Sequence, residues 1–438
     1  MSLSTEQSQR DRIKELSRKH VFTSWSAQGA LDQLPLAGGE GAHFWDYEGN
    51  RYLDLTSQLV NVNIGYQHPK LVAAIQEAAA QLTTIAPGFD SDSRAEAARM
   101  ISERAGDGMS KVFFTNAGAE AVENAIRFAR VHTGRHKVLA AYRSYHGATH
   151  GAIALTGEAR RLGSEPTIPG VVHFWGPYLY RSAFHATSEE EESQRALEHL
   201  RQTITFEGPS HIAAIILESV VGSNGILVPP PGYLEGVRAL CDEFGIMLIA
   251  DEVMAGFART GQWFAFQNWD VQPDLITFAK GVNSGYIPLG GVVISDAISA
   301  TFDEKPYPGG LTYSGHPLAC ASAVASMTIM EEEGILEHVR QLGENVLGPG
   351  LRALSEHAVV GDVRGLGVFW ALELVADRET REPLAADKLA AIGRACKDEG
   401  VWPLIMGNRV HVVPPCVITE DETRRALDVL GRALAAVS

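Results

Sequence analysis

Short, continuous apolar runs recur through the middle of the chain, and segments with helical periodicity separate them. They predict strands at 111–116, 137–142, 213–221, 246–250 and 275–279. Branched and aromatic residues without polar alternation are typical of strands that are buried on both faces of a parallel sheet. A strong helical pattern at 117–134 follows the first strand, and others stand between later strands. We therefore predict an α/β fold, with a mainly parallel central sheet wrapped by helices.

The pattern differs toward both ends of the chain. The segment HFWDYEGNRYLDL, 43–55, alternates around a tight turn and predicts a hairpin. From about residue 335, helical patterns alternate with the apolar segments 363–375 and 408–415. We predict a large domain at 76–330 and a smaller α+β domain, to which the N-terminal segment 1–75 and the C-terminal segment 331–438 both contribute.

Charge and composition restrict the class of partner. The chain has 438 residues and a net charge of −16, which argues against nucleic acid or an anionic membrane as the main partner. The N-terminus lacks the apolar core of a signal peptide, and no apolar stretch is long enough to span a membrane. Four cysteines are scattered without CxxC spacing, which indicates reduced thiols in the cytoplasm and offers no metal-site pattern: Cys241, Cys320, Cys396 and Cys416.

An acid and a lysine stand at the ends of two adjacent predicted strands. Asp251 follows the run IMLIA, and Lys280 follows LITFA. Ligands bind at the carboxyl ends of strands in open α/β sheets, and a buried lysine beside a buried acid is costly unless both are used. Pyridoxal 5′-phosphate uses both, a lysine as Schiff base and a carboxylate at its ring nitrogen. A structural ion pair or a solvated lysine is the alternative interpretation.

Two further strand ends carry residues suited to such a cofactor. TNAGAE, 115–120, opens a helix with small residues, and free N–H groups at a helix N-terminus suit a phosphate. An ordinary strand–helix turn would read the same way. In SYHG, 144–147, Tyr145 could lie flat on a conjugated ring, although the pattern by itself favours a core tyrosine and a hydrogen-bonded loop histidine. No nucleotide P-loop and no complete GxGxxG occurs.

Taken together, the motifs resemble those of class III (ω-amino acid) aminotransferases of fold type I, from about residue 30 to the C-terminus. The matching segments are WDYEGNRYLDL, NAGAEAVENAIRFAR, YHG, ESVVGSNGILVPPPGYL, LIADEVMAGFARTGQWFAF, PDLITFAKGVNSGYIPLGGV and TYSGHPLACA. Their order and spacing are specific. The resemblance implies a pyridoxal-phosphate enzyme whose 76–330 domain binds the cofactor. It also implies a homodimer, or a tetramer built from such dimers, in which segment 1–75 contributes to the dimer contact.

The same resemblance assigns roles to individual residues. Lys280 would form the Schiff base, and Asp251 would hold the proton of the pyridinium ring. Tyr145 would stack on one face of the ring and Val253 would pack on the other, while Thr312 would bind the phosphate in the neighbouring subunit. The implied cofactor-binding set is Gly118, Ala119, Tyr145, His146, Gly147, Glu218, Asp251, Val253, Lys280 and Thr312. The family often has serine or threonine where Ala119 stands.

Substrate choice is where the resemblance is weakest. Ser223 replaces a glutamate that is usual in the 4-aminobutyrate branch, and Leu404 replaces the mobile arginine of the ω-amine:pyruvate branch. Arg409 is therefore the expected anchor for a substrate carboxylate or sulfonate, with a solvent-facing strand arginine as the alternative. Leu59 and Val60 are expected to line an apolar pocket.

We predict transfer of an amino group from an ω-amino acid or amine, such as taurine or β-alanine, to a keto acid, either pyruvate or 2-oxoglutarate. A 4-aminobutyrate transaminase and a glutamate-semialdehyde-type aminomutase are alternatives within the fold. A non-catalytic regulator that binds pyridoxal phosphate is disfavoured, because no basic or helix-turn-helix segment is appended.

Overall fold

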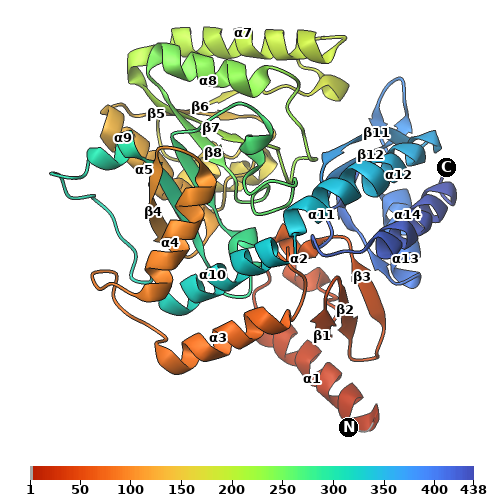
Figure 1. Ribbon diagram of the computed structural model, residues 1–438. Coiled ribbons are helices and arrows are strands. Elements are labelled where there is room, and N and C mark those ends of the chain that lie inside the picture. Colours follow the sequence, from red (N-terminus) through yellow and green to blue (C-terminus); the bar gives the residue numbers. More distant parts are fainter. Residues whose placement is uncertain (1–2) are drawn as a thin grey trace.

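A seven-stranded sheet forms the centre of the protein (Figure 1), in the order β4-β10-β9-β8-β7-β5-β6. The computed structural model describes residues 3–438, with side chains from residue 9 onward, so the first two residues of the polar N-terminus lie outside it. The strands are β4 (Met109–Thr115), β5 (Lys137–Ala141), β6 (Val171–Phe174), β7 (Ile212–Glu218), β8 (Met247–Asp251), β9 (Leu275–Phe278) and β10 (Gly290–Ser295). Strands β5 to β9 pair in parallel, and β10 pairs antiparallel with both β4 and β9. The predicted α/β fold with a mainly parallel sheet is confirmed.

Helices cover both faces of this sheet. Successive side chains of a strand point to opposite faces, and in β5 Val138 packs with α5 while Leu139 packs with α7 and α8. Helices α7 and α8 lie side by side (Figure 1). The helices of this part are α3 (Pro69–Gln81), α4 (Asp92–Ala105), α5 (Gly118–Thr133), α6 (His150–Leu155), α7 (Glu189–Glu207), α8 (Tyr233–Phe244), α9 (Asp296–Ala300) and α10 (Pro317–Glu332). Burial on both faces explains why these strands read as continuous apolar runs.

Two smaller sheets come from the ends of the chain. One has the order β1-β2-β3-β14, and its last pair joins the C-terminal β14 in parallel with the N-terminal β3. The other has the order β11-β12-β16-β15, with β13 beside β12. Their strands are β1 (Leu36–Glu40), β2 (His43–Asp46), β3 (Arg51–Asp54), β11 (Val360–Leu366), β12 (Phe369–Asp377), β13 (Glu382–Pro383), β14 (Val401–Trp402), β15 (Leu404–Met406) and β16 (Arg409–Val412). The predicted hairpin at 43–55 is present as β2 and β3.

The remaining helices belong to these end segments: α1 (Leu3–His20), α2 (Ser57–Val60), α11 (Ile335–Leu342), α12 (Gly348–Ala353), α13 (Ala386–Asp398) and α14 (Glu420–Ala435). Strand pairing between residues 51–54 and 401–402 agrees with a small domain that uses both ends of the chain. The domain boundaries near residues 75 and 330 stay predictions.

Two elements differ from the sequence-based expectation. The apolar segment 363–375 is not one strand but most of a hairpin, because the chain turns between β11 and β12. The sequence analysis predicts no strand between 142 and 213, but β6 lies there and adds a parallel strand at the sheet edge. A short edge strand has one neighbour only, so its sequence needs less apolar surface than a central strand.

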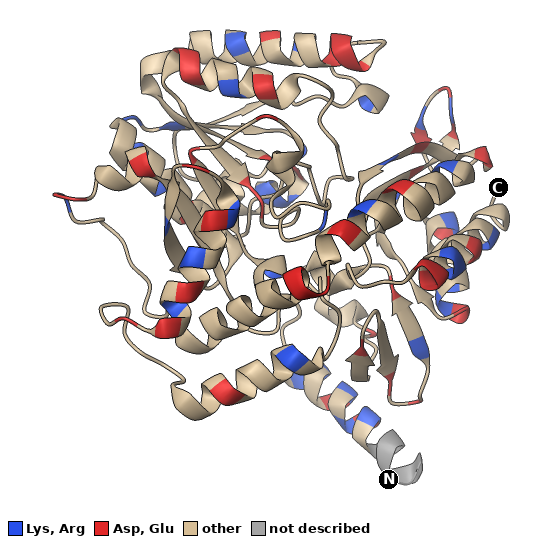
Figure 2. Cartoon of the chain, in the orientation of Figure 1, with Lys and Arg blue, Asp and Glu red and all other residues tan. Residues whose placement is uncertain are grey.

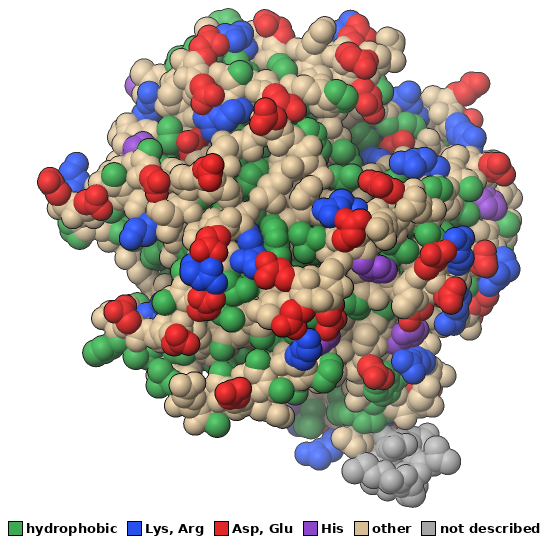
Figure 3. All heavy atoms as spheres, in the orientation of Figure 1, with side chains coloured by type: hydrophobic (Ala, Val, Ile, Leu, Met, Phe, Trp, Pro, Cys, Tyr) green, Lys and Arg blue, Asp and Glu red, His purple; other side chains and the backbone are tan. Residues whose placement is uncertain are grey.

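The exterior carries charges of both signs. Acidic and basic side chains alternate along the outer helices (Figure 2), and they are interspersed on the face shown in Figure 3. Within residues 3–438, no helix combines the length and the apolar character needed to cross a membrane.

Candidate active site

The carboxyl ends of β8 and β9 bring an acid and a lysine into one region. Asp251 is the last residue of β8 and is 3% exposed, and it lies opposite Thr277 in β9. Its Oδ1 accepts hydrogen bonds from the Thr277 hydroxyl and the Val253 N–H, each at 3.1 Å. Its Oδ2 lies 2.6 Å from Nδ1 of His146. The carboxylate is therefore held by one strand, β9, and by the loops that follow β5 and β8.

His146 is buried against this carboxylate. Burial alone would lower the pKa of His146, but the hydrogen bond and the charge of Asp251 outweigh it, so the pKa is raised. The second ring nitrogen, Nε2, is buried and has no hydrogen-bond partner within the described chain. The imidazole and the carboxylate thus form a buried pair.

Lys280 begins a short 3-10 turn (Lys280–Asn283) that follows β9, with φ at +45°. Left-handed backbone is uncommon outside glycine and clusters at functional sites. Burial of its ammonium group lowers the pKa to about 8, although Glu218 and Asp251 act in the opposite direction, and Arg160 and Arg259 add to the decrease. More of this amine is therefore neutral, and nucleophilic, near neutral pH than for a lysine with the ordinary pKa.

Glu218 ends β7, the strand beside β8, and its carboxylate organises two loops. Its Oε1 accepts the backbone N–H of Tyr145 at 2.9 Å, and its Oε2 accepts that of Gly222 at 2.7 Å. Burial raises the pKa of Glu218 to about 7, because desolvation and the nearby Asp251 outweigh the effect of His146. Near neutral pH the carboxyl group of Glu218 is thus partly protonated and partly ionised.

Small residues bring the first turn of α5 against the loops after β5 and β8. A Cβ on Gly118 would lie 2.7 Å from Cγ1 of Val253, and one on Gly147 would lie 2.6 Å from Cβ of Ala119. Only glycine permits these approaches. No side chain caps the N-terminus of α5, since its N-cap residue is Ala117. Uncapped N–H groups at a helix N-terminus suit an anion.

Nine of the ten cofactor-binding residues predicted from the sequence are connected by these contacts or by the effect of one charge on the pKa of another. The tenth, Thr312, is exposed in the loop between α9 and α10. The two expected pocket residues diverge: Leu59 is 57% exposed, whereas Val60 is 3% exposed and packs in an apolar cluster with Val220 and Ile226. The guanidinium of Arg409 donates to the carbonyl of Asn224 at 2.5 Å.

Arg160 was not predicted as a site residue from the sequence, but it contacts one of the predicted residues. The Arg160 guanidinium lies 3.8 Å from the centre of the Tyr145 ring, and its Nη2 donates to the Ser223 hydroxyl at 3.1 Å. It also contacts the carboxylate of Glu158. A cation therefore lies over the predicted ring-stacking tyrosine, and the Ser223 hydroxyl accepts a hydrogen bond from that cation.

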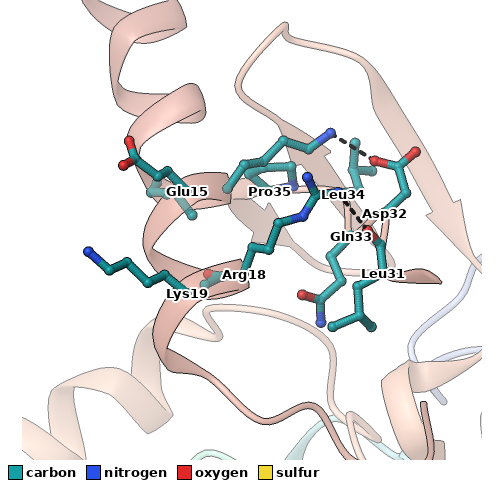
Figure 4. A pocket seen from close by; sticks show the side chains of 11 residues that line it. Glu15, Arg18, Lys19, Leu31, Asp32, Gln33, Leu34 and Pro35 are labelled. Atoms are coloured by element: carbon teal, nitrogen blue, oxygen red, sulfur yellow. Dashed lines mark hydrogen bonds and ion pairs between the residues drawn. The ribbon is translucent and has the colours of Figure 1, made fainter. Parts of the chain in front are cut away.

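A surface hollow of about 650 Å³ lies elsewhere (Figure 4). Helix α1 forms one wall, and residues 31–35 form the other. Lys14 pairs with Asp32, and Arg18 donates to the Leu31 carbonyl across it. None of the predicted site residues lines this hollow, so we place the chemistry at the strand ends.

Residues 27–434 match the family model "Aminotransferase class-III". A solved taurine:2-oxoglutarate aminotransferase from Bifidobacterium kashiwanohense, in complex with PLP and glutamate, is 41% identical, with 98% of each chain covered and a TM-score of 0.94. The taurine–pyruvate aminotransferase of Rhodobacter capsulatus is 35% identical over 95% of this chain and 94% of that protein. The putrescine–pyruvate aminotransferase of Pseudomonas aeruginosa is 34% identical over 96% of this chain and 97% of that protein.

Proposed function

The chain belongs to the class III aminotransferases, enzymes that use pyridoxal 5′-phosphate to transfer an amino group to a keto acid, and we propose that this member uses taurine or a similar short ω-amino acid as donor and 2-oxoglutarate as acceptor. The observation that carries the substrate proposal is the placement of the Arg160 guanidinium over the ring of Tyr145. The similarity to a taurine:2-oxoglutarate aminotransferase supports the same donor and acceptor.

The residues at the strand ends fit pyridoxal phosphate. The uncapped N-terminus of α5 offers N–H groups for the phosphate, the buried Asp251 offers a negative charge for the ring nitrogen, and Lys280 offers an amine with a lowered pKa. When bound, the cofactor supplies an aldehyde that takes up the amino group and a protonated ring that withdraws electrons from the bond to the departing hydrogen.

The protein contributes charge and proton transfer around this group. Asp251, fixed by Thr277 and His146, would hold a proton on the ring nitrogen, because a nearby negative charge favours the charged form. The Lys280 amine would hold the cofactor and, when free, would move a proton at the reacting carbon as a general base. Its pKa of about 8 suits both tasks near neutral pH.

Arg160 is placed to bind the acidic end of the substrate. Its guanidinium rests on the Tyr145 ring, which is predicted to cover the cofactor, and its charge contributes to the lowered pKa of Lys280. A planar guanidinium can bind a sulfonate or a carboxylate through two nitrogens. Taurine and 2-oxoglutarate both carry an acid distal to the reacting carbon, whereas pyruvate does not. One arginine can therefore serve donor and acceptor.

Arg409 remains the candidate that the sequence analysis favours, and a matched pair of variants separates the two. We expect Arg160→Gln to raise KM for taurine about tenfold to a hundredfold, because a charge-assisted contact contributes roughly 1.5–3 kcal/mol. Butylamine, which has no acidic group, should lose little in its own half-reaction. Arg409→Gln should affect taurine less than Arg160→Gln does. Single-turnover kinetics with each donor measure both effects, and a larger taurine-specific loss in Arg409→Gln would reverse the assignment.

The active unit is proposed to be a homodimer. The supporting surface is formed by the loops that contain Phe89 and Tyr313. Arg94 joins these loops, because its guanidinium donates to the carbonyls of Gly315 at 2.8 Å and Phe89 at 2.6 Å. Phe89 and Tyr313 are 64% and 60% exposed there, next to the exposed Thr312. Large apolar side chains gathered in the open mark an interface. Sedimentation of the holoenzyme at assay concentration tests this, and a fully active monomer would refute it. The tetramer and the cytoplasmic location stay predictions.

A further inference from the structure

The turn Gly222–Gly225, between β7 and α8, is held from several sides. Glu218 accepts the Gly222 N–H, and the Gly225 N–H donates to the Gly222 carbonyl at 3.0 Å. Gly225 has φ at +122°, a conformation that other residues rarely adopt, and a Cβ there would lie 2.6 Å from Nη2 of Arg364. The backbone of this turn is therefore in direct contact with an arginine from a different sheet.

Two arginines of the C-terminal sheet donate to consecutive carbonyls of this turn. Nε of Arg364, in β11, lies 2.7 Å from the Gly225 oxygen, and Nη1 of Arg409, in β16, lies 2.5 Å from the Asn224 oxygen. Charge-assisted hydrogen bonds are shorter and stronger than neutral ones. The turn is thus anchored to a sheet that is distant from it in sequence.

Arg364 is itself rigidly held. Its Nη1 pairs with Asp362 at 2.6 Å, its Nη2 pairs with Glu373 at 3.0 Å, and its guanidinium lies 4.9 Å from the centre of the Tyr178 ring. Only 11% of its side-chain surface is exposed. All three guanidinium nitrogens therefore have partners, and one of them, Nε, donates its hydrogen bond to the turn. A side chain fixed at this many points transmits the position of β11 to the turn.

The turn connects to the substrate site through Ser223. Its hydroxyl accepts from Nη2 of Arg160, the same guanidinium that lies over Tyr145. Because Ser223 has a single rotatable bond between backbone and hydroxyl, a shift of the turn moves this acceptor directly. We propose that Arg364 is a positioning residue: it fixes the turn 222–225 and, through Ser223, sets the Arg160 guanidinium over Tyr145 for an anionic substrate.

This inference rests on the proposed role of Arg160, and three variants test it. Arg364→Lys keeps a cation for Glu373 and Asp362 but cannot reach all three partners. Gly225→Ala disturbs the same contact from the turn, and Ser223→Ala removes the link to Arg160. Arg378→Lys is the matched control, because Arg378 also donates to a backbone carbonyl of the C-terminal lobe, that of His357 at 2.6 Å.

We expect each of the three variants to raise KM for taurine about tenfold while kcat with butylamine changes less than about twofold, since only the anion contact is altered. The Arg364→Lys/Ser223→Ala double variant should lose no more than the single ones, because both act through one contact. Arg378→Lys should behave as wild type. Equal losses for taurine and butylamine, or additive losses in the double variant, would overturn the proposal.

Crystal structures of wild type, Arg364→Lys and Gly225→Ala give a readout that does not depend on activity. We expect the turn to shift and the contact between Ser223 Oγ and Arg160 Nη2 to be lost in both variants. If the turn and Arg160 occupy their wild-type positions in both variants, the inference is wrong. Arg160→Gln reports separately on the proposed function: if it leaves KM for taurine unchanged, the anchor role fails, while the structures still decide whether Arg364 positions the turn.

Discussion

Replacing Lys280 with alanine is expected to abolish amino transfer, lowering kcat by on the order of 10⁴-fold or more, because one side chain supplies both the covalent link and the proton transfer. The amine stands after β9 with its pKa lowered to about 8, within reach of the charge of Asp251. No other lysine is placed to substitute for it among the residues of the site described above. The loss should therefore appear in both half-reactions.

Cofactor absorbance and peptide mapping check this result. Freshly reconstituted Lys280→Ala should lack the absorbance band of the covalently bound cofactor, and borohydride reduction of wild type should mark Lys280 alone. Lys137→Ala is the matched control, since Lys137 is also partly buried at a strand of the central sheet but pairs with Glu207. A pyridoxyl group on a different lysine of the wild-type enzyme would contradict the assignment.

Replacing Asp251 with asparagine should lower kcat by about 10³-fold, equivalent to about 4 kcal/mol at 1.36 kcal/mol per decade. The amide keeps the shape of the carboxylate and can still accept from Thr277, but it removes the negative charge that holds the ring proton. The electron-withdrawing power of the ring falls with that proton. The substitution isolates charge from geometry.

A second readout for Asp251→Asn needs no cofactor. Because Asp251 is what raises the pKa of His146 against the effect of burial, the asparagine variant should lower the pKa of His146 in the apoenzyme. An NMR titration, with His146→Gln to assign the resonance, measures this. Asp274→Asn is the control: Asp274 accepts the Leu248 N–H at 2.7 Å, at the opposite ends of the same strands, and should leave kcat within about twofold. A kcat within tenfold of wild type in Asp251→Asn would refute the role.

The central strands and their functional ends were predictable because burial on both faces leaves a clear signal. Continuous apolar runs located β8 and β9, and polar residues at their carboxyl ends then pointed to Asp251 and Lys280. Whether a strand pairs parallel or antiparallel with its neighbours was not predictable in the same way. The run that forms β10 would read alike in a parallel or an antiparallel strand, and the hairpin of β11 and β12 reads as one apolar segment.

Arg160 could not be found from the sequence because its partners are distant from it. It lies in a short 3-10 segment (Ala159–Ser164) without periodicity, and Ser223 is 63 residues further along the chain. The contacts of Arg364 and Arg409 with the turn 222–225 span 139 and 185 residues. Local patterns predict elements, whereas such contacts depend on how the elements pack.

The most direct test of the account follows the amino group itself. Purified holoenzyme is incubated with taurine labelled with heavy nitrogen and with 2-oxoglutarate, and glutamate is analysed by mass spectrometry. We predict that labelled glutamate accumulates in step with the loss of taurine, and that pyruvate in place of 2-oxoglutarate gives slower transfer. Label that stays in taurine, or transfer that favours neutral amines over taurine, would contradict the proposed function.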